Sequence, residues 1–312
     1  MSGTDSTNSP QATGGDELSE SATGIDALAV RSPRAPAFEF VRQLGENLAA
    51  GDFELPPFPD TAVRVQRCVN DPNSTVQDLA AIVASEPTLA ARLERMANSA
   101  AMRRGPIEVT DIPTAISRVG MAMVQNLAVA FAAREAFRCP PGNPSMEELN
   151  ALRRHSVKVA TISYFLGRYC PFGGKPEEAM LAGLLHAVGK FYIYMRAAEF
   201  PELFQDRSAL DAIVTRWHTG VARAIVESWE FPSSVAHGVD EQEVKSRHRA
   251  GAADLSDVLF LANLLTRAGF KAAAQFGDLD ALARLRTRPA DLSALLERHE
   301  EEIQSMIDAL SV

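Results

Sequence analysis

The chain has 312 residues, 46% hydrophobic and 23% charged, which is ordinary globular composition with room for one large domain or two small ones. The formal net charge of −9 argues against broad, non-specific nucleic-acid binding, which requires many Lys and Arg side chains against phosphates. The most apolar windows fall short of the ~20 residues that a membrane-spanning helix needs. We therefore expect neither a nucleic-acid partner nor a membrane.

Residues 1–35 are rich in Ser, Thr, Gly, Asp and Pro and hold few large apolar side chains. Such a segment buries too little surface to offset its ordering entropy, so a disordered tail is predicted. It also lacks the basic start and apolar run of a secretory signal. The three cysteines, Cys68, Cys139 and Cys170, cannot all pair and have no metal-binding spacing. These features favour free thiols in a reducing cytosol and a cytoplasmic protein.

Helical spacing of apolar residues dominates from Phe38 onward, and convincing strand alternation is scarce, so the predicted fold class is all-α. Ser74 or Thr75 is placed to cap one helix, and Pro87 suits the first turn of the next. The expected helices of this part cover Phe38–Leu48, Thr61–Val69, Val76–Val83 and residues 87–99, and two more begin at Asp111 and after Gly120.

The Pro- and Gly-rich segment Cys139–Pro144 is the strongest interior break, and it predicts a junction between two helical lobes, residues 36–143 and 144–312. Long helical patterns follow it, with a shorter helix after Pro232. The expected long helices cover Met146–Cys170, Pro176–Arg196, about Leu210–Trp229, Ala253–Phe276 and Pro289–Leu310.

The segment Leu55–Ala100 begins with Leu-Pro-x-x-Pro, continues through an Asn-Asp-Pro turn and a helix opened by an acidic residue and Pro, and ends in Ala-Asn-Ser-Ala. In this order and spacing the first lobe resembles the N-terminal part of an HDOD domain, whose family shares these motifs. The stretch after Asp111 resembles the family's Ala-Ile-x-x-x-Gly turn. The second lobe is similar to the HD-type helical core, with His155, His186 and His218 at the matching histidine segments. The resemblance covers about residues 38 to 270 and implies an HDOD-like, two-lobed helical domain.

The resemblance also implies that catalytic HD-type relatives bind a divalent metal through a His, a His-Asp pair and a final Asp. Here the pair is His186-Ala187, and the final position falls at Asn263. A methyl group has no lone pair, and a neutral amide oxygen is a poorer ligand for a hard cation than a carboxylate. If the family's final Asp is matched to an earlier position of the same helix, Asp254 or Asp257 becomes the candidate ligand. We expect no metal, no other cofactor and no catalytic residue.

The degenerate site remnant comprises His155, His186, Ala187, Lys190, His218 and Asn263. His155 shares a helical face with apolar residues, so we expect it and His186 to point inward as core histidines satisfied by hydrogen bonds. Lys190 is either a phosphate-facing residue or a Lys that keeps its charge in water at a helix end. Two basic pairs mark a candidate anion or partner site, or are ordinary surface charges: Arg103-Arg104 and Arg153-Arg154.

The leading functional hypothesis is a non-enzymatic regulatory module that acts through protein partners. The family resemblance implies bacterial signal transduction in two-component or cyclic-nucleotide circuits. Two alternatives remain open. One is a metal-dependent phosphohydrolase with an altered ligand set. The other is a sensor that holds a nucleotide or other small anion between the lobes, near His155, His186 and Lys190, with Arg103 as a further member.

Overall fold

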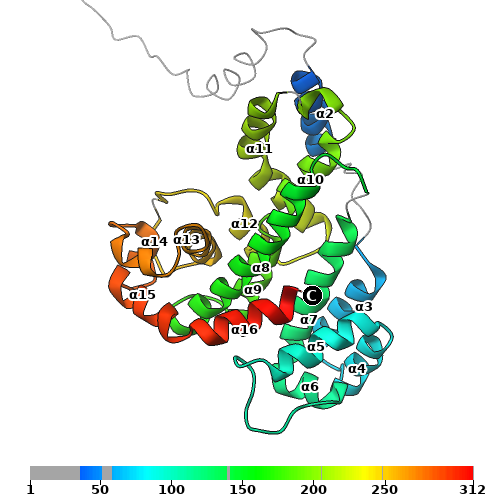
Figure 1. Cartoon of the computed structure of the whole chain (residues 1–312), viewed down its shortest axis with the longest axis vertical. Helices are drawn as coiled ribbons and strands as arrows, with labels where there is room; N and C mark the ends of the chain where they lie inside the picture. The colour runs from blue at the N-terminus through cyan, green and yellow to red at the C-terminus, as the bar shows by residue number, and fades with distance from the viewer. Residues whose placement is uncertain (1–35, 51–57, 139–140, 205, 248, 312) are drawn as a thin grey trace, which may run out of the picture.

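The computed structural model describes residues 36–50, 58–138, 141–204, 206–247 and 249–311, and every regular element in these ranges is a helix (Figure 1). The predicted all-α fold class is confirmed for this part of the chain. The predicted tail at residues 1–35, the Leu-Pro opening at residues 55–57, and Cys139 lie outside the described residues. Cys68 and Cys170 are both buried and are free thiols, and burial raises the pKa of the Cys170 thiol.

The first group of helices packs together at the lower end of the molecule in Figure 1. Thr75 and Asp78 form a reciprocal capping box at one helix start, and the Asp111 side chain accepts from Thr114 N at another. The group comprises α3 (Asp60–Asn70), α4 (Val76–Ala84), α5 (Pro87–Asn98), α6 (Ile112–Val119) and α7 (Met121–Ala136).

Within the described ranges no single helix is long and apolar enough to cross a membrane. Only α6 and α7 together reach that length and composition, and they meet at a bend of 105°. Gly120 lies between them with a φ of 90°, a backbone conformation that favours glycine.

The second group is arranged around a long central helix, α8 (Met146–Tyr169), which packs along α9 and α13. Gly183 permits the close approach of α9, because a Cβ there would lie 2.5 Å from Ala160 Cα. The other members are α9 (Pro176–Leu185), α10 (Val188–Ala197), α11 (Arg207–Ser228), α12 (Ser233–Asp240) and α13 (Leu255–Ala268), with the 3-10 helices η1 (Pro201–Phe204) and η2 (Lys271–Gln275).

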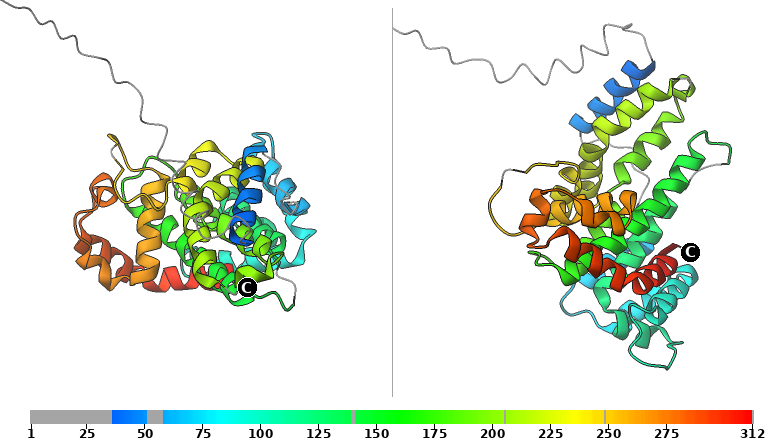
Figure 2. Two further views of the ribbon diagram at one scale, coloured as in Figure 1. Left: turned by 90° about the horizontal axis from the view of Figure 1, so that it is seen from above. Right: turned by 60° about the vertical axis from the view of Figure 1, so that its left-hand side comes forward.

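The C-terminal helices connect the two groups, as Figure 2 also shows. They are α14 (Asp280–Arg284), α15 (Pro289–Arg298) and α16 (Glu300–Ser311). Helix α15 packs against η2, and α16 packs against both α8 and α5. Ser305 Oγ accepts a hydrogen bond of 2.9 Å from Ala100 N, just beyond the end of α5. The last helix therefore holds the first group of helices against the second.

Three helices that the sequence predicts as continuous are each interrupted. The expected helix Pro176–Arg196 is α9 and α10, which are separated at His186 and Ala187. The physical reason is the packing of α10 on α11, because Gly189 lies so close to α11 that a Cβ would be 2.0 Å from the His218 carbonyl oxygen. A straight continuation of α9 does not lead to this contact.

The other two interruptions lie further along the chain. The expected helix Ala253–Phe276 ends at Gly269, whose φ is 86°, and η2 follows it. The expected helix Pro289–Leu310 divides into α15 and α16 at His299. The His299 ring stacks on Tyr169 with ring centroids 4.4 Å apart, so a contact with the end of α8 lies at this turn. Apolar spacing continues across both breaks and therefore does not reveal them.

Helix α2 (Pro36–Ala50) lies apart from the first group of helices. The sequence division assigns it to the first lobe, but it packs against α11 and η1 of the second group (Figure 2). Phe40 is buried against Phe200, with ring centroids 5.3 Å apart in an edge-to-face arrangement. The apolar face of this short helix is covered there. The boundary between residues 143 and 144 stays a prediction.

Candidate functional site

Two amide side chains link α8 to α13 and to the loop after α12. His155 Nε2 lies 2.9 Å from Asn263 Oδ1, and Asn263 Nδ2 donates to Gln242 Oε1 at 3.1 Å. Gln242 Nε2 donates to the carbonyl oxygens of His186 and Val239, at 2.7 and 2.8 Å. Because a carbonyl oxygen only accepts, the orientation of each amide is fixed from Gln242 outward. Asn263 therefore presents its oxygen to His155, and His155 carries its proton on Nε2.

His186 is buried beside this chain of hydrogen bonds. It is 2% exposed, its Nδ1 donates to Gly183 O at 2.7 Å, and its ring centroid lies 5.4 Å from that of His155. Burial, together with the nearby His155, lowers the pKa of His186 to about 3. Burial also lowers the pKa of His155, although the bond to Asn263 opposes this. Both imidazoles are therefore neutral at neutral pH, and the lone pair of His186 is on Nε2.

A carboxylate, Glu243, lies among the basic members of the site. Its Oε1 is 3.2 Å from His218 Nε2, 3.4 Å from Lys190 Nζ and 3.7 Å from Arg267 Nη2. The His218 contact is within ion-pair distance but lacks hydrogen-bond alignment. His218 itself is 1% exposed and donates through Nδ1 to Val214 O at 2.9 Å.

The electrostatics of Glu243 follow from these neighbours. The pKa of Glu243 is lowered to about 2, chiefly by the contact with His218, while burial opposes the shift and Lys190 and Arg267 assist it. Burial lowers the pKa of Lys190, and Glu243 partly counteracts this. The site thus holds an anionic Glu243 whose charge is balanced by Lys190 of α10 and Arg267 of α13.

The structure brings the sequence-predicted remnant together in two parts. His155, His186 and Asn263 share the amide-linked part, and Ala187 is fully buried in the break beside His186. Lys190 and His218 lie around Glu243 in the second part. Sequence reasoning missed Gln242 and Glu243, which lie in the loop after α12. No motif or apolar period marks them, and only the fold brings them here.

The residues present do not fit the divalent metal of catalytic HD-type proteins. Ala187 offers a methyl group, and the Asn263 oxygen already accepts from His155. His155 Nε2 carries a proton and so has no lone pair to give a metal. In the part of the chain that the structure describes, no three His, Cys, Asp or Glu side chains are grouped as a metal site. The donor set lacks the negative charge that a hard cation requires.

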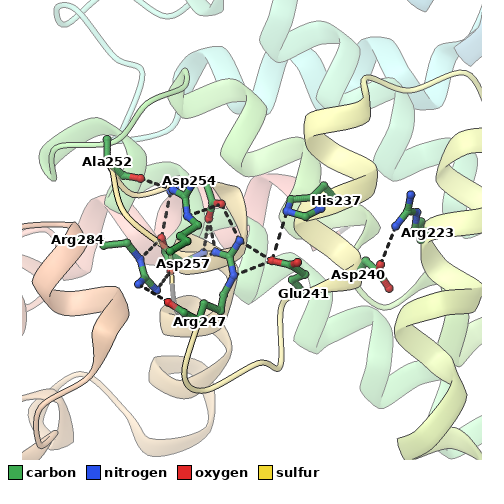
Figure 3. A network of polar contacts seen from close by, with 10 residues as sticks. Arg223, His237, Asp240, Glu241, Arg247, Ala252, Asp254, Asp257 and Arg284 are labelled. Atoms are coloured by element: carbon green, nitrogen blue, oxygen red, sulfur yellow. Dashed lines mark hydrogen bonds and ion pairs between the residues drawn. The ribbon is translucent and has the colours of Figure 1, made fainter. Parts of the chain in front are cut away.

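The carboxylates that a register shift would bring into play belong to a separate ion-pair network (Figure 3). Asp257 is 1% exposed and accepts from Arg284 Nε and Nη2 at 2.8 and 2.6 Å, with Arg247 Nη1 at 3.3 Å. Asp254 caps α13 and accepts from both Arg247 Nη atoms at 2.6 and 2.8 Å. Burial opposes ionisation of Asp254, but Arg247 more than offsets it and the pKa is lowered. Both carboxylates are therefore occupied in ion pairs with arginines.

The four arginines predicted to mark an anion site do not form one cluster. Arg153 and Arg154 line a pocket of about 500 Å³ between the two groups of helices. Arg103 and Arg104 are exposed in the loop between α5 and α6 and do not belong to the lining of that pocket. They follow the end of α5, whereas the pocket opens near its middle, and an anion or partner site that includes this pair stays a prediction.

The chain was compared with known proteins. The family model for the HDOD domain matches residues 55–244. A curated, uncharacterised protein of Treponema pallidum (strain Nichols) is 21% identical over 206 residues, which are 63% of this chain and 39% of that protein. The match therefore spans about two fifths of that relative's length.

Several solved structures share the fold. A proposed metal-dependent phosphohydrolase of Shewanella amazonensis SB2B has a TM-score of 0.70 at 22% identity, over 88% of this chain and 99% of that one. An HDOD domain protein of unknown function from Geobacter sulfurreducens has a TM-score of 0.64 at 19% identity, over 86% and 97%. A proposed signal transduction protein of Marinobacter aquaeolei VT8 has a TM-score of 0.61 at 22% identity, over 90% and 67%. At these identities the likeness shows the fold alone.

Proposed function

The chain belongs to the HDOD family, and from this premise we propose that it is a non-enzymatic regulatory module of bacterial signal transduction that acts by binding protein partners. The observation that carries the proposal is the bridging role of Asn263. Its oxygen and nitrogen are both used, toward His155 and Gln242. The position where catalytic relatives need a carboxylate is therefore part of a hydrogen-bonded structural link.

The energetics support this reading. Divalent metal catalysis needs ligands with lone pairs and enough negative charge to hold the ion and to activate a bound water. In this site Glu243 is a carboxylate, but its charge is balanced by Lys190 and Arg267. A metal would have to displace these contacts and to shift the His155 proton from Nε2 to Nδ1, away from its hydrogen bond with Asn263. Both changes cost free energy that the remaining neutral donors do not return.

The partner class follows from the family and from a similar fold. The Marinobacter protein of like fold is described as a proposed signal transduction protein. We propose that the partners are signalling proteins of two-component or cyclic-nucleotide circuits and that the module works in the bacterial cytoplasm. In this proposal the module signals by changing its contacts with partner proteins, since the site lacks the metal ligands that hydrolysis would need.

The competing function is a metal-dependent phosphohydrolase with an altered ligand set, as the Shewanella protein of like fold is proposed to be. Both functions are tested by one experiment on the purified chain. Metal content is determined by elemental analysis after purification with and without added manganese and iron. Hydrolysis of a chromogenic phosphodiester is then measured for the unmodified chain and for His186→Ala.

Our proposal expects less than about one-tenth of an equivalent of metal and a hydrolysis rate that His186→Ala does not change, because a working metal site needs near-stoichiometric occupancy. Near-stoichiometric metal, together with a rate abolished by His186→Ala, would establish the hydrolase instead. His237→Ala is the matched control, because His237 is an exposed histidine outside the site.

The partner-binding half of the proposal needs its own measurement. The chain is used as bait in extracts of its source bacterium, and each captured protein is purified and titrated against the chain by calorimetry. A reproducible, saturable complex with a signalling protein is expected. Capture of no protein that binds directly in the purified system would contradict this half of the proposal.

A further inference from the structure

A pocket of about 500 Å³ opens between the first group of helices and the second. Helices α5 and α7 contribute one side, α8, α9 and α10 contribute the other, and the C-terminal end of α16 completes the lining. Its volume lies within the range of about 300–1,000 Å³ that is usual for small-molecule sites. Its charged lining residues are Arg92, Arg134, Glu135, Arg138, Arg153 and Arg154.

The charge of this lining is opposite in sign to that of the whole chain. Five guanidinium groups and one carboxylate line the pocket, whereas the chain has a formal net charge of −9. Arg134, Arg138 and Arg154 form no ion pair with any residue that the structure describes. Arginines on a surface of an acidic protein normally find carboxylate neighbours, so this concentration of unpaired cations requires a reason.

Among the pocket arginines, Arg92 is the one that is not an ordinary surface residue. It lies on the buried face of α5, is 3% exposed, and its Nε has no hydrogen-bond partner in the described part of the chain. Its guanidinium lies 6.0 Å from the centroid of the Phe131 ring. Burial, followed by the charges of Arg134 and Arg95, lowers the pKa of Arg92 to about 10. A buried cation among cations is unfavourable unless a counter-charge is supplied.

The opposite side of the pocket carries a second buried polar group without a partner. Ser156 on α8 is 6% exposed, and its Oγ has no hydrogen-bond partner among the described residues. Next to it the lining is apolar, with Val157, Leu184 and Phe191. The Arg153 guanidinium lies 5.9 Å from the centroid of the Phe191 ring, which gives this wall a flat, cationic edge.

We propose that this pocket binds a small organic phosphate of about the size of a mononucleotide, with its phosphate against the arginines and its ring against the Phe191 side. Guanidinium groups match phosphate oxygens in charge and in planar, two-pronged geometry. Ser156 adds a hydroxyl donor. An inorganic ion would leave the apolar wall unfilled, and a pocket of this volume is too small to enclose a folded macromolecule.

The position of the pocket gives binding a consequence for the fold. Arg92 and Arg134 belong to the first group of helices, and Arg153, Ser156 and Phe191 belong to the second. A ligand that contacts both sides stabilises the arrangement in which they are closest. This inference goes beyond the proposed function and does not depend on it, because none of the histidines, Asn263, Gln242 or Glu243 lines the pocket.

The test is calorimetric titration of the full chain with ATP, AMP, GMP and inorganic phosphate, at low and at high salt. At least one of the nucleotides is expected to bind in the micromolar range, more weakly at high salt. Arg92→Met and Arg154→Gln should each weaken that binding at least about tenfold. The double variant Arg103→Gln/Arg104→Gln is the matched control, since it removes two exposed arginines outside the pocket and should bind as the unmodified chain does.

Failure of all three nucleotides to bind would overturn the proposal, as would unchanged binding in both pocket variants. Inorganic phosphate that binds as tightly as any nucleotide would also overturn it, because the ring would then contribute nothing. Arg154→Gln keeps the test valid if Arg92→Met does not fold, since Arg154 is exposed. In the absence of ligand we expect Arg92→Met to unfold at a temperature no lower than that of the unmodified chain, because it removes a buried charge that Glu135 offsets only in part.

Discussion

His155 and Asn263 are 108 residues apart in the sequence, and a hydrogen bond of 2.9 Å joins His155 Nε2 to Asn263 Oδ1. This bond connects α8 with α13 at the position where the family resemblance implies two ligands of one metal ion. Both groups are neutral, and each satisfies the other. The link therefore has the form of a core contact between two helices.

Restoring the two missing carboxylates should restore metal binding. In the double variant Ala187→Asp/Asn263→Asp, two negative charges lie near His186 and His155, so millimolar manganese should raise the unfolding temperature by several degrees. A ligand at about 100 times its Kd stabilises by about 2.7 kcal/mol. Differential scanning fluorimetry measures the shift. The neutral variant Ala187→Asn is the control, and an equal shift in the unmodified chain would contradict the degenerate-site reading.

Gln242 should stabilise the fold more than an ordinary glutamine. It is 1% exposed and makes three hydrogen bonds, to His186, Val239 and Asn263. Gln242→Met keeps its shape but leaves these buried groups without partners, at a cost of about 1–3 kcal/mol. Urea unfolding measures the loss.

The control for this prediction is Gln304→Met, at an exposed glutamine of α16, where a change near zero is expected. Equal stabilities of the two variants would show that the amide chain contributes little to the fold.

The free energy of unfolding should fall as the pH is lowered from 7 to 5. The pKa of His186 is about 3 in the folded chain and about 6.5 in the unfolded chain, so between these values the unfolded state binds the extra proton. The stability is therefore fully present above about pH 6.5 and declines below it, by up to about 1.4 kcal/mol per pH unit. His155 acts in the same direction.

This pH dependence is measured by urea unfolding at several pH values. The range stops at pH 5 because the stability contributed by Glu243, whose pKa is lowered to about 2, is lost only below the ordinary glutamate pKa of 4.5. His186→Met should flatten the profile, and His237→Gln, at an exposed histidine, should leave it unchanged. A profile equally steep in His186→Met would contradict the assignment.

The network around Asp257 should be the most sensitive ion-pair cluster of the second group. Asp257→Asn removes the carboxylate partner of the mostly buried Arg284 and leaves this cation facing a neutral amide, whereas Arg247 keeps its pair with Asp254. Breaking one partner of a buried pair costs about 3–5 kcal/mol, so we expect about 3 kcal/mol in urea unfolding.

The control for this prediction is Asp291→Asn, which breaks an exposed pair with Arg288 and should cost at most about 1 kcal/mol. A similar small loss in both variants would mean that the Asp257 network is not a stabilising element.

Local signals in the sequence were sufficient for the starts of several helices. Thr75, Pro87 and Asp111 begin helices where capping and proline rules place them, because a cap depends on residues within one turn. The same rules failed for the break at His186, where apolar spacing continues but the packing of Gly189 on α11 requires a new direction. One usable signal was missed, since Arg92 lies three residues after Leu89 and four before Met96, on a buried face.

The amino-acid sequence by itself determined the helical class, the family resemblance, and the presence of Ala187 and Asn263 where the resemblance implies carboxylates, because each of these is a property of residue type and near neighbours. Only the tertiary structure decided that Gln242 and Glu243 join the histidines and that five arginines line one pocket. The reason is distance along the chain. Side chains from separate helices and loops meet only when the core is packed, and no local period or motif encodes that meeting.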